Sequence, residues 1–151
     1  MVKKLEWQKH KNVIAQANTI YFVDVETNIG KRLINLGFEP EAISIGIAKA
    51  VNNQKPASCF YREFLPIRQV DQEAFKIHGL SNEYLANKPR FLKSDALEIN
   101  KLLLNSKACF AHNSAFEKQV LDYMYRFVGL TFMPFQKLQC TQQLAREMGL
   151  S

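Results

Sequence analysis

The segment Ile20–Glu26, with the sequence IYFVDVE, constrains the fold more than any other part of the chain. Most of its residues are β-branched or aromatic, which are the types that favour strands. Its second half alternates Val23 and Val25 with Asp24 and Glu26. Successive side chains of a strand point to opposite faces, so the two acids share one face and the two valines share the other. The segment therefore predicts a buried strand whose end presents two carboxylates on one face.

Two ionised carboxylates at one strand end repel each other, and burial without a cation would raise their pKa values and weaken the fold. A divalent cation removes this conflict, and oxygen ligands suit Mg²⁺ or Mn²⁺. A solvent-facing strand end, where both acids are simply hydrated, is the alternative. The acid pair Asp24 and Glu26 does not by itself decide between these two interpretations.

The remaining pattern predicts an α/β chain in the order β-β-β-α-β-α-β-α. Short links between the first three strands predict an antiparallel meander, and the later βα units predict a mixed sheet with helices on its faces. That order resembles a ribonuclease-H-like sheet, with the first strand between the second and the fourth. The ranges are strands at 20–26, 42–51, 57–66, 107–112 and 134–140, helices at 92–106, 114–129 and 141–149, a turn or loop at 27–41, and broken helix and loop at 72–91. We treat 1–18 as an N-terminal arm or helix and 19–151 as one domain.

Two helical faces are predicted to pack inward. In the first helix the apolar spacing selects Leu92, Ala96, Ile99 and Leu103. In the second it selects Phe116, Val120, Met124 and Phe127, with Gly129 as the residue that ends the helix.

A third acid, Glu117, falls in the first turn of the helix that follows the strand at 107–112. The helix dipole favours a negative charge there. A neighbouring strand and helix start can bring this carboxylate to the end of the first strand. A glutamate that only stabilises the helix is the alternative, and Asp122, one turn further on, is a weaker ligand candidate.

The bulk composition excludes a membrane span and leaves the partner open. No apolar run approaches the roughly 18 residues of a membrane helix, and the basic N-terminus lacks the apolar core of a signal peptide. We therefore expect a cytoplasmic protein with no membrane partner. The net charge of +6 permits a phosphate-rich partner, but the Lys and Arg residues are scattered, so a surplus of surface Lys explains it equally well.

Five segments, in this order, resemble motifs of the DEDD, or DnaQ-like, family of 3′–5′ exonucleases: FVDVETNIG, AISIGIAKA, AFKIHGLSNEYLANKPRF, CFAHNSAFEKQVLD and LQCTQQLAREM. The resemblance covers roughly residues 20 to 148 and implies a metal-dependent nuclease. In that family four acids hold two divalent ions about 4 Å apart, which clamp the scissile phosphate. The resemblance implies Mg²⁺ or Mn²⁺ as cofactor and a DNA or RNA 3′ end as substrate.

The resemblance also assigns site residues. Asp24, Glu26 and Glu117 would be catalytic metal ligands, while Thr27, His78 and Asn113 would bind the substrate. Two alternatives stay open: His78 caps the turn at Gly79, or Asn113 orients the helix start. The aromatic residues that could stack on bases are Phe75, Phe91 and Phe116, with core packing as the alternative for Phe116.

Three departures from the family pattern keep other functions open. The turn Thr27–Gly30 holds one residue more than the family's, Glu117 replaces an aspartate, and the third motif, His-x-x-x-x-Asp, does not occur before Ser151. We therefore expect a C-terminally shortened exonuclease domain. A degenerate module that binds nucleic acid or a protein without cleavage is the first alternative, and an unrelated interaction module is the second. Shortening would expose apolar residues of the last helix, which predicts a homo-dimer.

Overall fold

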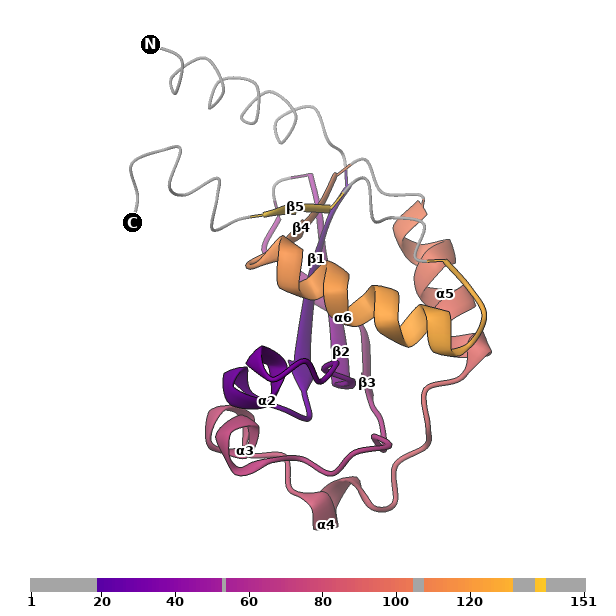
Figure 1. The fold of residues 1–151 in the computed structure, drawn as a ribbon. Helices are drawn as coiled ribbons and strands as arrows, with labels where there is room; N and C mark the ends of the chain where they lie inside the picture. Colours follow the sequence, from indigo (N-terminus) through magenta and orange to yellow (C-terminus); the bar gives the residue numbers. More distant parts are fainter. Residues whose placement is uncertain (1–18, 53, 105–107, 132–137, 141–151) are drawn as a thin grey trace.

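A computed structural model of the chain describes residues 19–52, 54–104, 108–131 and 138–140. Its centre is a five-stranded sheet in the order β3-β2-β1-β4-β5 (Figure 1). The strands β1 (Thr19–Thr27), β2 (Ala42–Val51) and β3 (Ala57–Glu63) pair antiparallel, as the meander prediction requires. The strands β4 (Ala108–Ala111) and β5 (Leu138–Cys140) join in parallel, so β1 lies between β2 and β4 as predicted.

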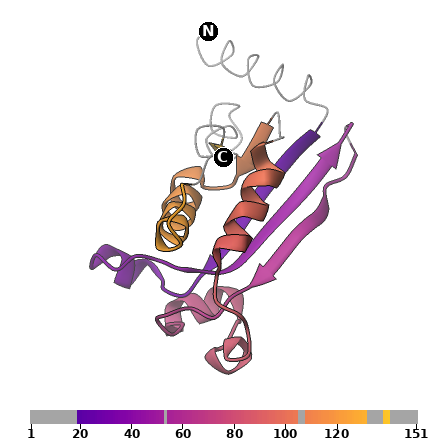
Figure 2. The ribbon, with the colours of Figure 1, turned by 90° about the vertical axis from the view of Figure 1, so that its right-hand side faces the viewer.

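Two longer helices, α5 (Lys93–Leu104) and α6 (Ser114–Phe127), cover the same face of this sheet (Figure 2). The core between them and the sheet includes the alternate β1 residues Tyr21, Val23 and Val25. Because these three side chains point toward the helices, the β1 side chains between them point to the other face. The alternation read from the sequence therefore holds, and Asp24 and Glu26 face away from the main core.

Three short helices lie at the end of the sheet where β1 ends: α2 (Lys31–Asn35), α3 (Gln72–His78) and α4 (Asn82–Leu85) (Figure 1). A second, smaller cluster of buried residues, formed by Ile43, Val70, Ala74 and Leu85, includes one residue of α3 and one of α4. Asp71 caps the start of α3, because its side chain accepts a hydrogen bond from the Ala74 backbone N–H at 2.7 Å.

Several sequence predictions were wrong in detail. The segment predicted as a turn or loop contains α2, and the strand predicted at 57–66 ends at Glu63. Leu92 and Phe127, expected in the core, are 55% and 63% exposed. Leu92 precedes the first helical residue of α5. Phe127 lies off the buried stripe of α6, which follows the i, i+3, i+4, i+7, i+8 pattern and is formed by Glu117, Val120, Leu121, Met124 and Tyr125.

The predicted N-terminal arm (1–18) and final helix (141–149) lie outside the described residues. Gly129 adopts φ of 77° just after α6, as expected for the glycine that ends a helix. None of the helices that the structure describes is long and apolar enough to cross a membrane.

Candidate active site

The three acids selected from the sequence meet at the end of β1. Val23 pairs with Ala111, the last residue of β4, and the chain then turns through His112 and Asn113 into α6. The Asn113 side chain caps this helix by accepting a hydrogen bond from the Phe116 backbone N–H at 3.4 Å. The first turn of α6 therefore starts beside the end of β1, and it places Glu117 where it interacts electrostatically with Asp24 and Glu26.

Glu117 is the most perturbed of the three acids. Its side chain is buried, with the residue only 4% exposed, and burial followed by the charge of Asp24 raises its pKa to about 8. The Val25 backbone N–H hydrogen bonds to this carboxylate and partly offsets the rise in pKa. Its other oxygen, Oε2, is buried without a hydrogen-bond partner. An unpaired buried oxygen of this kind costs stability unless something else occupies the space beside it.

The two strand acids show shifts in the same direction. Burial raises the pKa of Asp24, and the charge of His112 opposes the rise. Burial and then the charge of Asp24 raise the pKa of Glu26, and His78 opposes that rise. Burial thus opposes ionisation of all three carboxylates, and the charge of Asp24 adds to this effect at Glu26 and Glu117.

Carboxylate oxygens suit a divalent cation, although the side chains of these acids are not arranged around a cation site. Within the described ranges, no group of three or more His, Cys, Asp or Glu side chains is placed so that it could hold a metal ion. The unpartnered Oε2 of Glu117 and the raised pKa values of all three acids are nevertheless what a cation would relieve. The three acids therefore fit a divalent cation in two ways: they supply oxygen ligands, and their pKa values are raised in its absence.

The loop after β1 is firmly anchored. Asn28 is fully buried, and it exchanges side-chain hydrogen bonds with Glu41: Nδ2 donates to the carboxylate at 2.8 Å, and Oδ1 accepts from the Glu41 backbone N–H at 2.8 Å. Glu41 also accepts from the backbone N–H groups of Ile67 and Arg68. Asn28 thus fixes the loop to the rest of the fold. Sequence reasoning missed Glu41, because one acid in a loop carries no signal of its distant partners.

The other end of this loop is held by α3. The backbone N–H of Gly30 donates to the Asp71 carboxylate at 3.0 Å, and that of Lys31 donates to Glu73 at 2.8 Å. A Cβ on Gly30 would lie 2.5 Å from Cδ of Glu73, so only glycine allows this close approach without a shift.

His78 ties α3 to the end of β1. Its Nδ1 accepts a hydrogen bond from the Leu80 backbone N–H at 2.9 Å, which leaves Nε2 to carry the proton and donate to the Thr27 carbonyl at 2.9 Å. Both ring nitrogens are therefore engaged, as the turn-capping alternative requires. The Thr27 hydroxyl is also engaged, because it donates to the Ile29 carbonyl at 3.0 Å.

Comparison with known proteins shows what this chain resembles. No model of a known protein family matches the chain. Among individual proteins, it is 31% identical over 104 residues to the DNA polymerase III subunit epsilon of Escherichia coli, an alignment that covers 68% of this chain and 42% of that protein. It is 28% identical over 131 residues to the same subunit of Haemophilus influenzae, with 83% and 49% covered.

Over these aligned residues the chain resembles the DnaQ-like exonuclease family. It spans less than half the length of these two curated relatives. Solved structures support the ribonuclease-H-like fold. A product-bound exonuclease I matches with a TM-score of 0.69 at 14% identity, covering 87% of this chain and 31% of that one. Exonuclease X in complex with 5′ overhanging duplex DNA matches with a TM-score of 0.58 at 22% identity, covering 85% and 63%.

Three further candidates in this DnaQ-like chain do not join the acids in the way expected. Phe91 is partly buried and packs against the core, with its ring centroid 5.3 Å from that of Phe64, and its base-stacking role stays a prediction. Phe116 is half-buried and packs against the core, in line with the alternative left open for it. Asp122 forms an ion pair with Arg126 at 3.3 Å on the outer side of α6.

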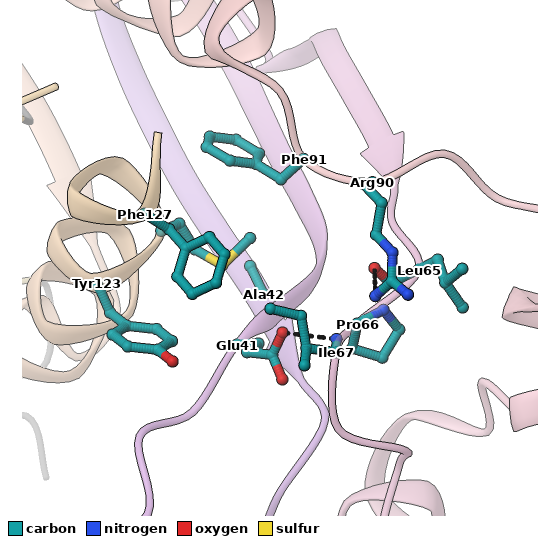
Figure 3. A pocket seen from close by; sticks show the side chains of 10 residues that line it. Glu41, Ala42, Leu65, Pro66, Ile67, Arg90, Phe91, Tyr123 and Phe127 are labelled. Atoms are coloured by element: carbon teal, nitrogen blue, oxygen red, sulfur yellow. Dashed lines mark hydrogen bonds between the residues drawn. The ribbon is translucent and has the colours of Figure 1, made fainter. Parts of the chain in front are cut away.

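The chain also has an apolar hollow away from the acids. It has a volume of about 240 Å³ and lies between α6 and the loop that follows β3 (Figure 3). Side chains at its rim include Tyr123 and Phe127 from α6 and Pro66 and Ile67 from the loop (Figure 3). None of the three acids lines it, so it is separate from the candidate active site.

Proposed function

We propose that this chain is a metal-dependent 3′–5′ exonuclease domain that hydrolyses phosphodiester bonds at the 3′ ends of DNA or RNA by a two-metal mechanism. One observation supports this most: in a DnaQ-like chain, the buried Glu117 has an unpartnered Oε2 and lies beside Asp24 and Glu26. The curated relatives are polymerase subunits, and the similar structures are exonucleases, some of them bound to DNA. These likenesses support the reaction class proposed here.

In this proposal Asp24, Glu26 and Glu117 hold the cations. When bound, the cations would supply Lewis acidity toward the scissile phosphate and the attacking water. The carboxylates contribute negative charge and oxygen donors. Glu117 itself is held by the Val25 backbone N–H, which leaves Oε2 as its free donor atom.

The neighbouring residues would position the terminal nucleotide. Thr27 immediately follows Glu26, and its carbonyl is fixed by His78, so the end of β1 presents a rigid backbone edge beside the acids. Asn113 fixes the start of α6 and with it the position of Glu117. We infer that Thr27 and Asn113 lie along the nucleotide, while His78 supports this edge through its hydrogen bond to Thr27.

A second candidate function is a module that binds nucleic acid, or a protein, without cleaving it. Two observations favour it. Among the described residues, no group of three or more His, Cys, Asp or Glu side chains is placed to hold a metal ion, and Glu117 stands where the resembled family has aspartate. A cytoplasmic location and a homo-dimer remain predictions, since the apolar residues invoked for the dimer lie outside the described ranges.

Incubation of a 5′-labelled single-stranded oligonucleotide with Mn²⁺ tests the proposal, with DNA and RNA versions run in parallel. We expect a ladder of products shortened from the 3′ end that disappears in Asp24→Ala and persists in Asp122→Ala, the matched acid on the outer side of α6. Intact oligonucleotide in every reaction, together with metal-dependent binding, would support the non-cleaving module and contradict the exonuclease.

A further inference from the structure

The face of the sheet that carries the acids extends across β2 to an exposed tyrosine on β3. Asp24 pairs with Gly46, and Gly46 pairs in turn with Tyr61. Directly paired residues of neighbouring antiparallel strands point to the same face, so Tyr61 and Asp24 lie on one side of the sheet. Two strand spacings of about 4.8 Å place their backbones roughly 10 Å apart.

No side chain projects from the sheet between Asp24 and Tyr61 in the row of directly paired residues. The residue at that point of β2 is Gly46, which has no side chain to rise above the sheet. A Cβ built there would meet Cδ2 of the Tyr61 ring at 3.6 Å, so the ring edge rests against β2. In the row of directly paired residues, Gly46 alone lies between Asp24 and Tyr61.

A second tyrosine, Tyr84 from α4, hydrogen bonds to the same carboxylate as Tyr61, that of Glu63. The Tyr61 hydroxyl donates to Oε2 of Glu63 at 2.9 Å, and the Tyr84 hydroxyl donates to Oε1 of Glu63 at 2.5 Å. The ammonium of Lys88 lies 3.2 Å from Glu63 and 4.7 Å from the centroid of the Tyr84 ring. Although burial alone would raise the pKa of Glu63, the hydrogen bonds from Tyr84 and Tyr61 hold it below its usual value. The carboxylate therefore stays an acceptor for both hydroxyls.

Both tyrosine rings remain widely exposed although their hydroxyl groups are fixed. Tyr61 is 57% exposed and Tyr84 is 49% exposed. Exposed aromatic rings that are already immobilised lose little conformational entropy when they bind a partner. Aromatic rings beside a nucleic-acid path bind bases by stacking, largely irrespective of base identity. Cross-strand packing against Gly46 explains the position of Tyr61 only, whereas Tyr84 comes from another element and is held by the same carboxylate.

We propose that Tyr61 and Tyr84 form an aromatic platform on which bases of the substrate strand stack, just 5′ of the nucleotide held at the acids. This inference rests on the proposed function, since it takes the 3′ end of the strand to lie at Asp24, Glu26 and Glu117. The ligand is single-stranded nucleic acid, and the contact is with the base rather than with the phosphate. Glu63 is a positioning residue that acts through the two hydroxyl groups.

The test is binding of a labelled oligonucleotide to the full 151-residue chain, measured by fluorescence anisotropy with Ca²⁺ in place of Mg²⁺ or Mn²⁺. We expect Tyr61→Ala to weaken binding roughly tenfold, the size typical of one lost stacking contact. Tyr61→Phe keeps the ring and should bind almost as tightly as the parent chain. Phe127→Ala removes an aromatic ring of similar exposure on the other side of the sheet and should have no effect. Tyr84→Ala, on a separate element, gives an independent measurement if Tyr61→Ala proves unstable.

Oligonucleotides with a single abasic residue locate the contact. The Tyr61→Ala penalty should vanish when the abasic residue occupies the stacked position near the 3′ end and should persist when it lies elsewhere, because only then is the base already missing. Binding of both alanine variants at parent affinity would overturn the platform, as would a penalty that is the same for every abasic position.

Failure of the platform and failure of the proposed function give different results. A parent chain that cleaves in Mn²⁺, with platform variants that bind and cleave as it does, refutes the platform alone. A parent chain that binds but does not cleave, with the tenfold penalty present, refutes the exonuclease and retains the platform. No binding of the oligonucleotide by the parent chain refutes both.

Discussion

The substitution Glu117→Gln separates the charge of the buried acid from its shape. Glu117 is 4% exposed, and its pKa is raised from 4.5 to about 8. A rise of this size corresponds to a free energy of about 5 kcal/mol between the two protonation states. Because the folded pKa lies above the unfolded one, the folded chain holds the proton more tightly. The corresponding stability is fully present below about pH 4.5 and is lost as the pH rises through about 8.

Glutamine has nearly the same shape and stays uncharged throughout this range. Its oxygen can still accept from the Val25 backbone N–H, and its amide group can donate toward Asp24 or Glu26, which lie nearby. We therefore expect Glu117→Gln to be almost as stable as the parent chain at pH 5 and more stable by a few kcal/mol at pH 8, both in EDTA. Mn²⁺ should reverse the order, because a cation that binds only the folded chain stabilises the parent and not the variant.

Urea unfolding at a series of pH values, in EDTA and in Mn²⁺, measures these free energies. Asp122→Asn is the control on the same helix, because its exposed ion pair with Arg126 is worth only about 0.5 kcal/mol and should show no comparable dependence on pH or Mn²⁺. The reasoning is refuted if Glu117→Gln and the parent chain share one pH profile in EDTA. Equal stabilisation of both proteins by Mn²⁺ would remove Glu117 from the metal site.

Four further substitutions test the framework around the site by urea unfolding. Asn28→Ala should cost about 2 to 3 kcal/mol, since the buried Glu41 backbone N–H loses its partner, and a loss below 0.5 kcal/mol would show that the loop is not anchored there. Gly79→Ala should cost about 1 kcal/mol through its φ of 73° alone, because its new Cβ meets nothing within 4 Å, and an unchanged stability would refute that conformation. Leu121→Ala should cost about 3 kcal/mol and Phe127→Ala under about 1 kcal/mol, and the reverse order would mean that the buried stripe of α6 is misassigned.

The sheet was the part of the fold best predicted from the sequence. Alternation along β1 separated Asp24 and Glu26 from Val23 and Val25 correctly, because a strand period of two leaves only one choice of faces. The links between the first three strands predicted the antiparallel meander, and the resemblance to a ribonuclease-H-like sheet predicted that the first strand lies between the second and the fourth. Helical faces were less certain, and Phe127 was assigned to the core because a hydrophobic residue one turn from Met124 fits the spacing almost as well as Leu121 does.

The sequence predicted the acids of the candidate site but not the hydrogen bonds that hold the surrounding loops in place. Glu117 was found because helix-start geometry and the family resemblance point to the same residue. The partners of Asn28 and His78 could not be found, because each depends on a backbone group brought close only by the folded loop, at Glu41 and at Thr27. A single sequence contains no periodic signal for such contacts. The tyrosines of the aromatic platform share this limit, since strand register and α4 bring them together.

The measurement that tests the central claim most directly is anomalous diffraction from crystals of this chain soaked in Mn²⁺. We predict anomalous density bounded by carboxylate oxygens of Asp24, Glu26 and Glu117, with Oε2 of Glu117 at a ligand distance of about 2.1 Å. Crystals that show no density there, or density that Glu117 does not contact, would contradict the assignment of these three acids as a metal site.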